Sequence, residues 1–365
     1  MKHFTKNYRY LPASVEFDFF TEDALLFDIE TTGLSKKTHH IYLIGCAHRK
    51  GNDIVVHQYF AEEENDESEM IAAFLSLSHQ FRQFITFNGK RFDEPFLLEK
   101  CHKYHLDVRQ LPTEHLDIYL ECKKLKPLLA LNSYKQKSVE TFLGIARDDK
   151  YDGGQLIDVY KDYVDTKDST MLDLLLLHNY EDVVGMIQLL PMLSYQSLRN
   201  QPINITSLTL ENYNDLTGES RQELTFTATL PVSVPKAIKL HRLQCHLFIQ
   251  DDTLRGSIPL YHGILRHYLP NHRDYVYLPQ EDMIVLKSMA HCIPSGAKEK
   301  ATPANCYVKK EGEFLLLPTT LSLTEDVYRF SISHTAKEEY ILYDPNIVNS
   351  SFMEQYLSCF LKELT

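Results

Sequence analysis

The fold is decided by residues 25–34, which read Leu-Leu-Phe-Asp-Ile-Glu-Thr-Thr-Gly-Leu. A short apolar run that ends in a turn signal predicts a buried β-strand. Alternate side chains of a strand share a face, so we expect Asp28 and Glu30 to lie side by side. Two like charges in an apolar setting are costly unless a cation neutralises them, and a divalent metal with oxygen ligands is the usual partner. The alternative is a strand end at which both carboxylates are hydrated.

Size and composition are those of a globular protein. A chain of 365 residues is too long for one typical domain, so we expect two. No apolar stretch approaches the roughly 20 residues of a membrane span, and no apolar signal core follows the basic N-terminus. The sequence therefore predicts a cytoplasmic protein without a membrane partner. Seven cysteines without Cys-x-x-Cys pairing argue against a disulfide framework and a structural zinc site.

The net charge of −12 disfavours a protein that coats nucleic acid by electrostatics alone. It does not exclude a nuclease, because carboxylates that bind metal contribute to this charge.

The segments that follow predict a mixed α/β sheet. Two more strands are expected at residues 41–47 and 53–60, joined by a turn, and a helix is expected at residues 66–81. Residues 83–87 read as a fourth strand. A strand that follows a helix implies a crossover connection, and hence a partly parallel sheet.

A third acid, Asp93, follows the fourth strand. Residues 88–98 read Asn-Gly-Lys-Arg-Phe-Asp-Glu-Pro-Phe-Leu-Leu, in which Asn-Gly is a turn and Pro95 indicates the start of a helix. Asp93 would then be the N-cap of that helix, and this capping role is the alternative to a functional one. The end of a strand is, however, also where open α/β sheets place their ligands.

Further helices are expected at residues 115–129, 133–143, 155–163 and 170–190, with a polar, glycine-rich loop at 147–154. A capping box formed by Thr170 and Asp173 is expected to start the last helix.

The last helix contains His178 and Asp182. Residues four apart on a helix share a face, with about 6 Å between their Cβ atoms, so both side chains can address one site. Taken alone, the pair is better explained as a surface histidine beside an exposed acid. The combination in one chain is much less expected by chance. It consists of an acid pair on a first strand, an acid after a later strand and this pair on a late helix.

These three segments, in this order, resemble the three motifs of the DEDD (DnaQ-like) 3′–5′ exonucleases, which have a ribonuclease-H-like fold. The similar segments are residues 27–34, 87–97 and 178–183. Residues 147–149 and 160–168 are similar to the YprB-type branch of that superfamily. The resemblance covers about residues 20–195.

The resemblance implies hydrolysis of phosphodiester bonds with two divalent cations, Mg²⁺ or Mn²⁺. Their implied ligands are four carboxylates, those of Asp28, Glu30, Asp93 and Asp182. Asp28 is the implied bridge between the ions, Glu30 and Asp182 complete the site that holds the attacking water, and Asp93 reaches the other ion.

His178 is suited to accept the proton of that water near neutral pH. The third motif departs from the family here. In the family, either a histidine with four residues or a tyrosine with three residues usually precedes the aspartate, whereas here a histidine with three does. This leaves open whether His178 deprotonates the water or only orients it.

Candidate substrate contacts lie in two turns beside the acids. Backbone amides of the turn after Glu30 could bind the terminal nucleotide, and the resemblance puts a leucine of that turn against the last bases. The candidates are Thr31, Gly33, Leu34 and Asn88. The alternative is a turn with a core leucine.

Beyond residue 200 the pattern becomes β-rich. Residues 223–230 alternate with period two, and strands are expected at 244–250 and 253–261 around a turn at Asp251-Asp252, with a strand and a terminal helix within 340–364. The aromatic and basic segment 262–277 could form a stacking and phosphate surface. Tyrosines at alternating positions are, however, more often part of a core.

The sequence therefore predicts an α/β protein, with a ribonuclease-H-like mixed sheet flanked by helices and followed by a β-rich second domain. The expected parts are an N-terminal extension at residues 1–20, an exonuclease domain at 21–198 and a β-rich domain of unassigned role at 199–365. The resemblance implies an exonuclease that acts on DNA rather than RNA, in repair, with a helicase-associated role. Residues 275–279 and 305–310 are similar to stretches of bacterial relatives, which indicates a bacterial protein. The alternatives are an exoribonuclease, since nothing in the sequence reports on the 2′-hydroxyl, and a catalytically silent nucleic-acid-binding module.

Overall fold

The computed structural model describes residues 1–9, 19–148, 151, 153–200, 202–242, 244–324 and 326–364. The chain divides into two compact units, Met1–Gln196 and Ser197–Thr365, and each is described by itself.

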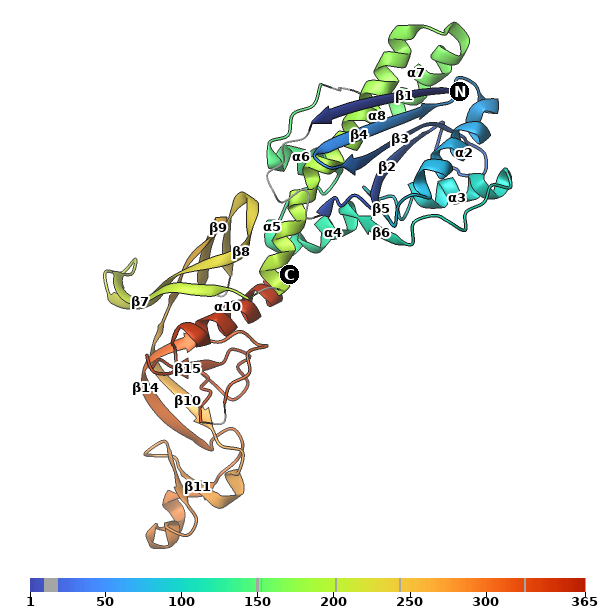
Figure 1. Ribbon diagram of the computed structural model, residues 1–365. Helices are drawn as coiled ribbons and strands as arrows, with labels where there is room; N and C mark the ends of the chain where they lie inside the picture. Colours follow the sequence, from blue (N-terminus) through green and yellow to red (C-terminus); the bar gives the residue numbers. More distant parts are fainter. Residues whose placement is uncertain are drawn as a thin grey trace. The chain divides into compact units, whose positions relative to one another are not determined.

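A mixed sheet organises the first unit (Figure 1). Within the described residues it has six strands in the order β1-β4-β3-β2-β5-β6. The strands are β1 (Lys2–Arg9), β2 (Ala24–Thr31), β3 (Ile41–Lys50), β4 (Asp53–Phe60), β5 (Gln83–Thr86) and β6 (Glu114–Asp117). Neighbours from β1 to β2 pair antiparallel, whereas β2, β5 and β6 pair parallel. The predicted meander and crossover are therefore confirmed.

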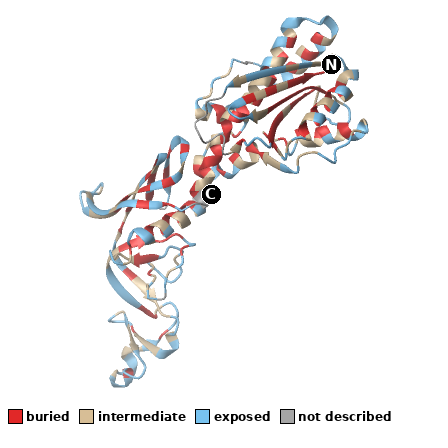
Figure 2. Cartoon of the chain, viewed as in Figure 1, coloured by how far each residue is buried: buried red, intermediate tan, exposed pale blue. Residues whose placement is uncertain are grey.

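Helices cover both faces of this sheet. The helices of the unit are α2 (Glu67–Ser78), α3 (Asp93–Lys103), α4 (Ile118–Lys124), α5 (Lys126–Leu129), α6 (Gln136–Leu143), α7 (Gly153–Thr166) and α8 (Ser169–Leu189), with 3₁₀ turns at Glu64–Asp66 and Leu190–Gln196. Apolar side chains of α2 and α3, such as Phe74 and Leu97, pack with Phe27 of β2. Side chains of α7 and α8, such as Tyr160 and Leu175, form a second cluster against the sheet. Burial on both faces explains why the central strands are apolar along nearly their whole length (Figure 2).

Four local features differ from expectation. Lys2–Arg9, expected within an N-terminal extension, pairs along β4 instead. The segment expected as a helix at residues 115–129 begins with β6, because the parallel sheet extends by one more strand. Helix α8 is capped by Asp168, whose carboxylate accepts a hydrogen bond from the backbone N–H of Thr170, so the capping box predicted there is wrong. The fourth difference concerns Asp93 and is described with the site. Of the loop predicted at 147–154, residues 149, 150 and 152 lie outside the described residues.

The second unit is β-rich, as predicted. Its described strands form three sheets with the orders β7-β8-β9, β10-β14-β15 and β12-β11-β13. The elements are α9 (Ser197–Asn200), β7 (Asn204–Asn214), β8 (Ser220–Arg242), β9 (Cys245–Pro259), β10 (Tyr261–Tyr268), β11 (Tyr275–Leu278), β12 (Met283–Leu286), β13 (Glu299–Lys300), β14 (Tyr307–Leu316), β15 (Tyr340–Leu342) and α10 (Ser350–Leu364), with 3₁₀ turns at His272–Asp274, Ala290–Cys292 and Ser295–Ala297. The turn predicted at Asp251 is a register shift inside the continuous strand β9, with Asp251 at a left-handed φ of 52°. Across the described residues, no helix combines the length and apolarity needed to cross a membrane.

Candidate active site

The centre of the site is the pair of acids on β2. Phe27 and Ile29 point into the apolar cluster beneath α2 and α3, so the alternating side chains of Asp28 and Glu30 point to the other face. Helix α8 packs on that face. The pairing of β2 with β3 shifts register between Glu30 and Thr31, so the ladder is interrupted directly after the two acids. Irregularities of this kind are common beside active sites, because they re-aim side chains.

Asp93 joins this pair from the start of α3. Its Oδ1 accepts a hydrogen bond from the backbone N–H of Ile29 at 3.1 Å, between the two acids of β2. Asp93 is the first helical residue, and the N-cap position belongs to Phe92, so the capping role considered from the sequence is wrong. The hydrogen bond across 64 residues attaches the start of α3 to β2, and the Asp93 side chain is 5% exposed.

His178 and Asp182 join from α8, on the shared helix face that their spacing predicts. His178 Nε2 lies 3.1 Å from Asp182 Oδ2 and 3.4 Å from Glu30 Oε1. His178 is 4% exposed and the side chain of Asp182 is 18% exposed, so the two are not the surface histidine and exposed acid considered as the alternative. The imidazole therefore lies between a carboxylate of the sheet and a carboxylate of the helix.

The electrostatics of the acids follow from this crowding. Burial, together with the negative charges of Asp93, Asp182 and Glu30, raises the pKa of Asp28 well above its usual value. Burial likewise raises the pKa of Asp93 to about 7, although its hydrogen bond from Ile29 N–H works in the opposite direction. Burial alone would also raise the pKa of Asp182, but His178 and Arg147 hold it below its usual value. The site is thus a buried cluster of acids, in which Asp182 is already paired with His178 and Arg147.

Asn179 is a site residue that the sequence analysis did not single out. Its Nδ2 donates a hydrogen bond to Asp28 Oδ2 at 3.3 Å, and its Oδ1 accepts one from Gln58 Nε2 at 3.1 Å. Gln58 Nε2 also donates to the backbone carbonyl of Leu176 at 2.8 Å. A Cβ atom on Gly45 would lie 2.1 Å from Asn179 Oδ1, so only glycine leaves room for this amide. The available signal was position, because Asn179 lies next to His178 in the third motif.

Arg147 is the second such residue. Its Nε lies 2.8 Å from Glu140 Oε2 on α6, and its Nη2 contacts Asp182 Oδ1. Gln136 Nε2 donates to Glu140 Oε1 and to the Asp182 backbone carbonyl, both at 3.0 Å. These contacts connect α6 with the part of α8 that contains Asp182. Sequence reasoning placed Arg147 in a branch-specific segment but gave it no role.

The donor set fits a hard divalent cation. Among the described residues, one group of three metal-ligating side chains has its donor atoms within 4.8 Å of one another, namely Glu30, His178 and Asp182. Asp28 and Asp93 add buried carboxylate oxygens, whose pKa values are raised first by burial and further by neighbouring acids. Oxygen-rich sites with mutual repulsion of this kind suit Mg²⁺ or Mn²⁺.

The expected substrate-contact residues have varied surroundings. Thr31 is buried, and its Oγ1 donates to the Gly33 carbonyl at 3.0 Å. A Cβ on Gly33 would lie 2.5 Å from the His39 ring, so glycine permits this close turn. Leu34 is 86% exposed, which rules out the alternative of a core leucine. Asn88 has a left-handed φ of 66°, and its N–H donates to the buried Asp117 at 2.9 Å. Contact of these residues with substrate stays a prediction.

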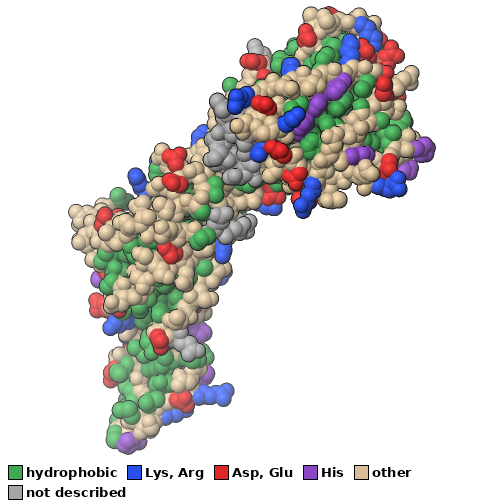
Figure 3. All heavy atoms as spheres, in the orientation of Figure 1, with side chains coloured by type: hydrophobic (Ala, Val, Ile, Leu, Met, Phe, Trp, Pro, Cys, Tyr) green, Lys and Arg blue, Asp and Glu red, His purple; other side chains and the backbone are tan. Residues whose placement is uncertain are grey.

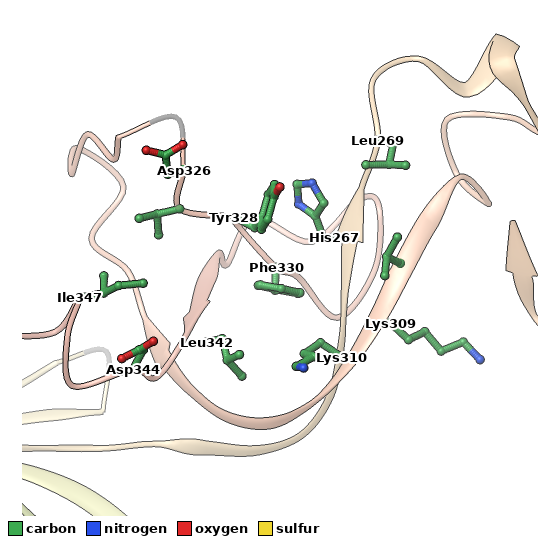
Figure 4. A pocket seen from close by; sticks show the side chains of 12 residues that line it. His267, Leu269, Lys309, Lys310, Asp326, Tyr328, Phe330, Leu342, Asp344 and Ile347 are labelled. Carbon is green, nitrogen blue, oxygen red and sulfur yellow. The ribbon is translucent and has the colours of Figure 1, made fainter. Parts of the chain in front are cut away.

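The aromatic and basic segment predicted at residues 262–277 belongs to the second unit. His267 lines a cavity of about 500 Å³ there, together with Tyr328 and Phe330 (Figure 4). Its Nδ1 donates to the Arg329 carbonyl at 2.8 Å, and Arg266 lies over a neighbouring tyrosine ring. The wall of this cavity contains lysines as well as aspartates, so its mixed charge does not favour a polyanion such as nucleic acid. A nucleic-acid surface in this unit stays a prediction.

One family model and several solved structures are similar to parts of the chain. Residues 25–194 match the family model described as the RNase H superfamily. No curated protein matches the chain.

Several solved structures align with parts of the chain. A family B DNA polymerase from the archaeon Pyrobaculum calidifontis is 13% identical, with a TM-score of 0.36, over 73% of this chain and 39% of the polymerase chain. Exonuclease I of E. coli in complex with a dA16 oligonucleotide is 10% identical, with a TM-score of 0.29, over 57% of this chain and 55% of its own. The apo form of a nuclease is 14% identical, with a TM-score of 0.33, over 53% of this chain and 80% of its own.

The family match covers all five residues of the acidic site and supports a nuclease. It confirms, at the level of the superfamily, the relationship that the three motifs predict. Residues 25–194 therefore match the RNase H superfamily and have a ribonuclease-H-like fold.

Proposed function

We propose that the protein is a metal-dependent 3′–5′ exonuclease of the DEDD type that hydrolyses DNA. The observation that supports this most strongly is the convergence of residues from three distant parts of the chain. Asp93 bonds the backbone between the two acids of β2, and His178 lies between Glu30 and Asp182. The direction of digestion and the preference for DNA come from the resemblance of the three motifs. Roles in repair and with a helicase stay predictions from the same source.

Two divalent cations bound by Asp28, Glu30, Asp93 and Asp182 would neutralise the charge of the phosphoryl oxygens and of the leaving oxygen. The protein's own residues do the remaining work. Asn179 and the N–H of Ile29 fix the directions of Asp28 and Asp93. His178 lies beside two of these acids, with its Nε2 3.1 Å from Asp182 Oδ2 and 3.4 Å from Glu30 Oε1, and the resemblance of the third motif supports a role for it in orienting the attacking water or taking its proton.

Arg147 has a separate role in this proposal. Its contact with Asp182 Oδ1 leaves Asp182 Oδ2 to His178, so the two oxygens of one carboxylate have different partners. The arginine thereby holds the rotamer of the acid that α8 presents to the site.

Labelled oligonucleotides test the proposal. Single- and double-stranded DNA and single-stranded RNA, each labelled at the 5′ or the 3′ end, are incubated with the protein and Mn²⁺. We expect 5′-labelled DNA to yield a ladder of shortened strands and 3′-labelled DNA to release the label as a mononucleotide at once. EDTA should stop both.

The remaining outcomes separate the alternatives. Digestion of RNA but not DNA would replace the proposal with an exoribonuclease. Intact strands in every lane, with strand binding in a gel-shift assay, would indicate a silent binding module.

A further inference from the structure

Three histidines form a row across the sheet, away from the acids. His3 of β1, His57 of β4 and His48 of β3 lie on neighbouring strands, and Figure 3 shows histidine side chains gathered over these strands. His57 Nδ1 is 3.1 Å from His3 Nε2, and His57 Nε2 is 3.4 Å from His48 Nε2. His57 thus turns a different ring nitrogen to each neighbour.

A third donor atom completes a small triangle at the outer end of this row. Thr5 Oγ1 lies 3.4 Å from His3 Nε2 and 3.3 Å from His57 Nδ1, and these two nitrogens are 3.1 Å apart. Two ligands of a tetrahedral ion at 2.0–2.1 Å lie about 3.3 Å apart. The three atoms therefore have the spacing of one face of a tetrahedral metal site.

We propose that His3 and His57 bind a transition-metal ion of the Zn²⁺ or Cu²⁺ class, with Thr5 Oγ1 at the third corner and solvent at the fourth. Imidazole nitrogens suit these ions, unlike the oxygen-rich acidic site, which suits Mg²⁺ or Mn²⁺. A threonine hydroxyl is a weak ligand, so the two imidazoles supply most of the affinity.

The surroundings of the two imidazoles match those of metal ligands. A ligating histidine usually donates its other ring N–H to a fixed acceptor, which sets its tautomer and orientation. With an ion on His57 Nδ1, the remaining ring proton of His57 lies on Nε2, and His48 Nε2 at 3.4 Å is in position to accept it. The His3 ring stacks on Tyr59, with 4.3 Å between centroids and 11° between planes.

This site is separate from the acidic site. His48 pairs with Leu25 at the start of β2, whereas Asp28 pairs with Gly45 further along the same strand. Side chains at positions 46 and 48 of β3 share the face covered by α2, and Gly45 faces α8. The consequence of ion binding would be structural, because β1 is an edge strand and the ion would fasten it to β4.

Titration of Zn²⁺ and Cu²⁺ into the full chain tests the proposal. The protein must lack a polyhistidine tag, and excess Mg²⁺ is present so that the acidic site does not compete. We expect one ion per chain and a rise in melting temperature with Zn²⁺. His3→Gln and His57→Gln should lower the affinity more than about tenfold, and His48→Gln about tenfold.

Two control variants locate the site. His102→Gln changes an exposed histidine of α3, and His178→Gln changes the histidine of the acidic site, so both should bind the ion as the wild type does. Should His57→Gln fail to fold, His3→Gln still decides, because that side chain is exposed on the edge strand. The electron paramagnetic resonance spectrum of bound Cu²⁺ should show two nitrogen ligands, and one in His3→Gln. Absence of binding by the wild type, or equal binding by wild type and His3→Gln, would overturn the proposal.

Discussion

Asn179 Nδ2 donates a hydrogen bond of 3.3 Å to Asp28 Oδ2, across 151 residues of sequence. This contact joins α8 to β2 at the acidic centre, and Asn179 is fully buried. Gln58 fixes the orientation of the amide, and Gly45 provides the space for it. The direction of the central acid thus depends on residues that bear no charge.

Replacing this amide should lower activity without unfolding the protein. We expect Asn179→Ala to reduce kcat about 10- to 100-fold, the usual cost of losing a residue that orients a metal ligand. Gly45→Ala should act in the same direction, because its Cβ would displace the amide. Steady-state kinetics with Mn²⁺ measures both. Gly296→Ala is the matched control, since no atom lies within 4 Å of a Cβ there and activity should not change. Full activity of Asn179→Ala would show that Asp28 needs no such support.

Asp28→Asn should separate catalysis from stability. We expect cleavage to fall at least about a hundredfold, because the charge that holds the cations is lost. The melting temperature in EDTA should hold or rise, since the variant relieves repulsion among Asp28, Asp93 and Glu30. Differential scanning calorimetry beside a cleavage assay measures the two effects. A large loss of stability together with activity would mean that Asp28 is structural.

Arg147→Met should destabilise the protein. Glu140 is 1% exposed and Arg147 Nε lies 2.8 Å from its Oε2, so the variant removes the cation in contact with a buried carboxylate. Breaking one side of a buried ion pair costs about 3–5 kcal/mol, which denaturant unfolding measures. The double variant Glu140→Gln/Arg147→Met should recover much of that loss. No recovery would indicate that the loss arises from the contact with Asp182 instead.

Stability in EDTA should depend on pH through Asp93. Its pKa is about 7 in the folded protein and about 3.9 in an unfolded chain, so the folded state holds the proton more tightly. The contribution of protonated Asp93 to the free energy of unfolding is therefore fully present below about pH 4. It is lost as the pH rises to about 7, which lowers the free energy of unfolding by at most about 4 kcal/mol.

Asp93→Asn isolates this contribution, because asparagine does not titrate. The difference in unfolding free energy between wild type and variant should change across this pH range in EDTA, and Mn²⁺ should remove the wild type's loss. A difference that is constant with pH would contradict the burial of Asp93.

The sequence predicted the parts of this protein that depend on local pattern and on motif order. The strand of Asp28 and Glu30, the crossover to β5 and the helix of His178 and Asp182 all follow from apolar periodicity and residue spacing. The resemblance of these segments to one superfamily followed from the order of the motifs along the chain.

Features set by tertiary contacts could not be predicted in this way. β6 is a short strand only because β5 offers an edge for parallel pairing, and Lys2–Arg9 is a strand only because β4 offers one for antiparallel pairing. The sequence alone did not decide between a cap and a site residue for Asp93, since it does not show that Ile29 N–H lies within reach of that side chain. The roles of Asn179 and Arg147 could not be predicted either, because their hydrogen-bond and ion-pair partners are distant in sequence.

Digestion of a 5′-labelled DNA strand with Mn²⁺, compared between the wild type and Asp182→Asn, tests the central claim most directly. The account predicts a ladder that shortens from the 3′ end with the wild type and an intact strand with the variant. An intact strand with the wild type, or equal digestion by both proteins, would contradict it.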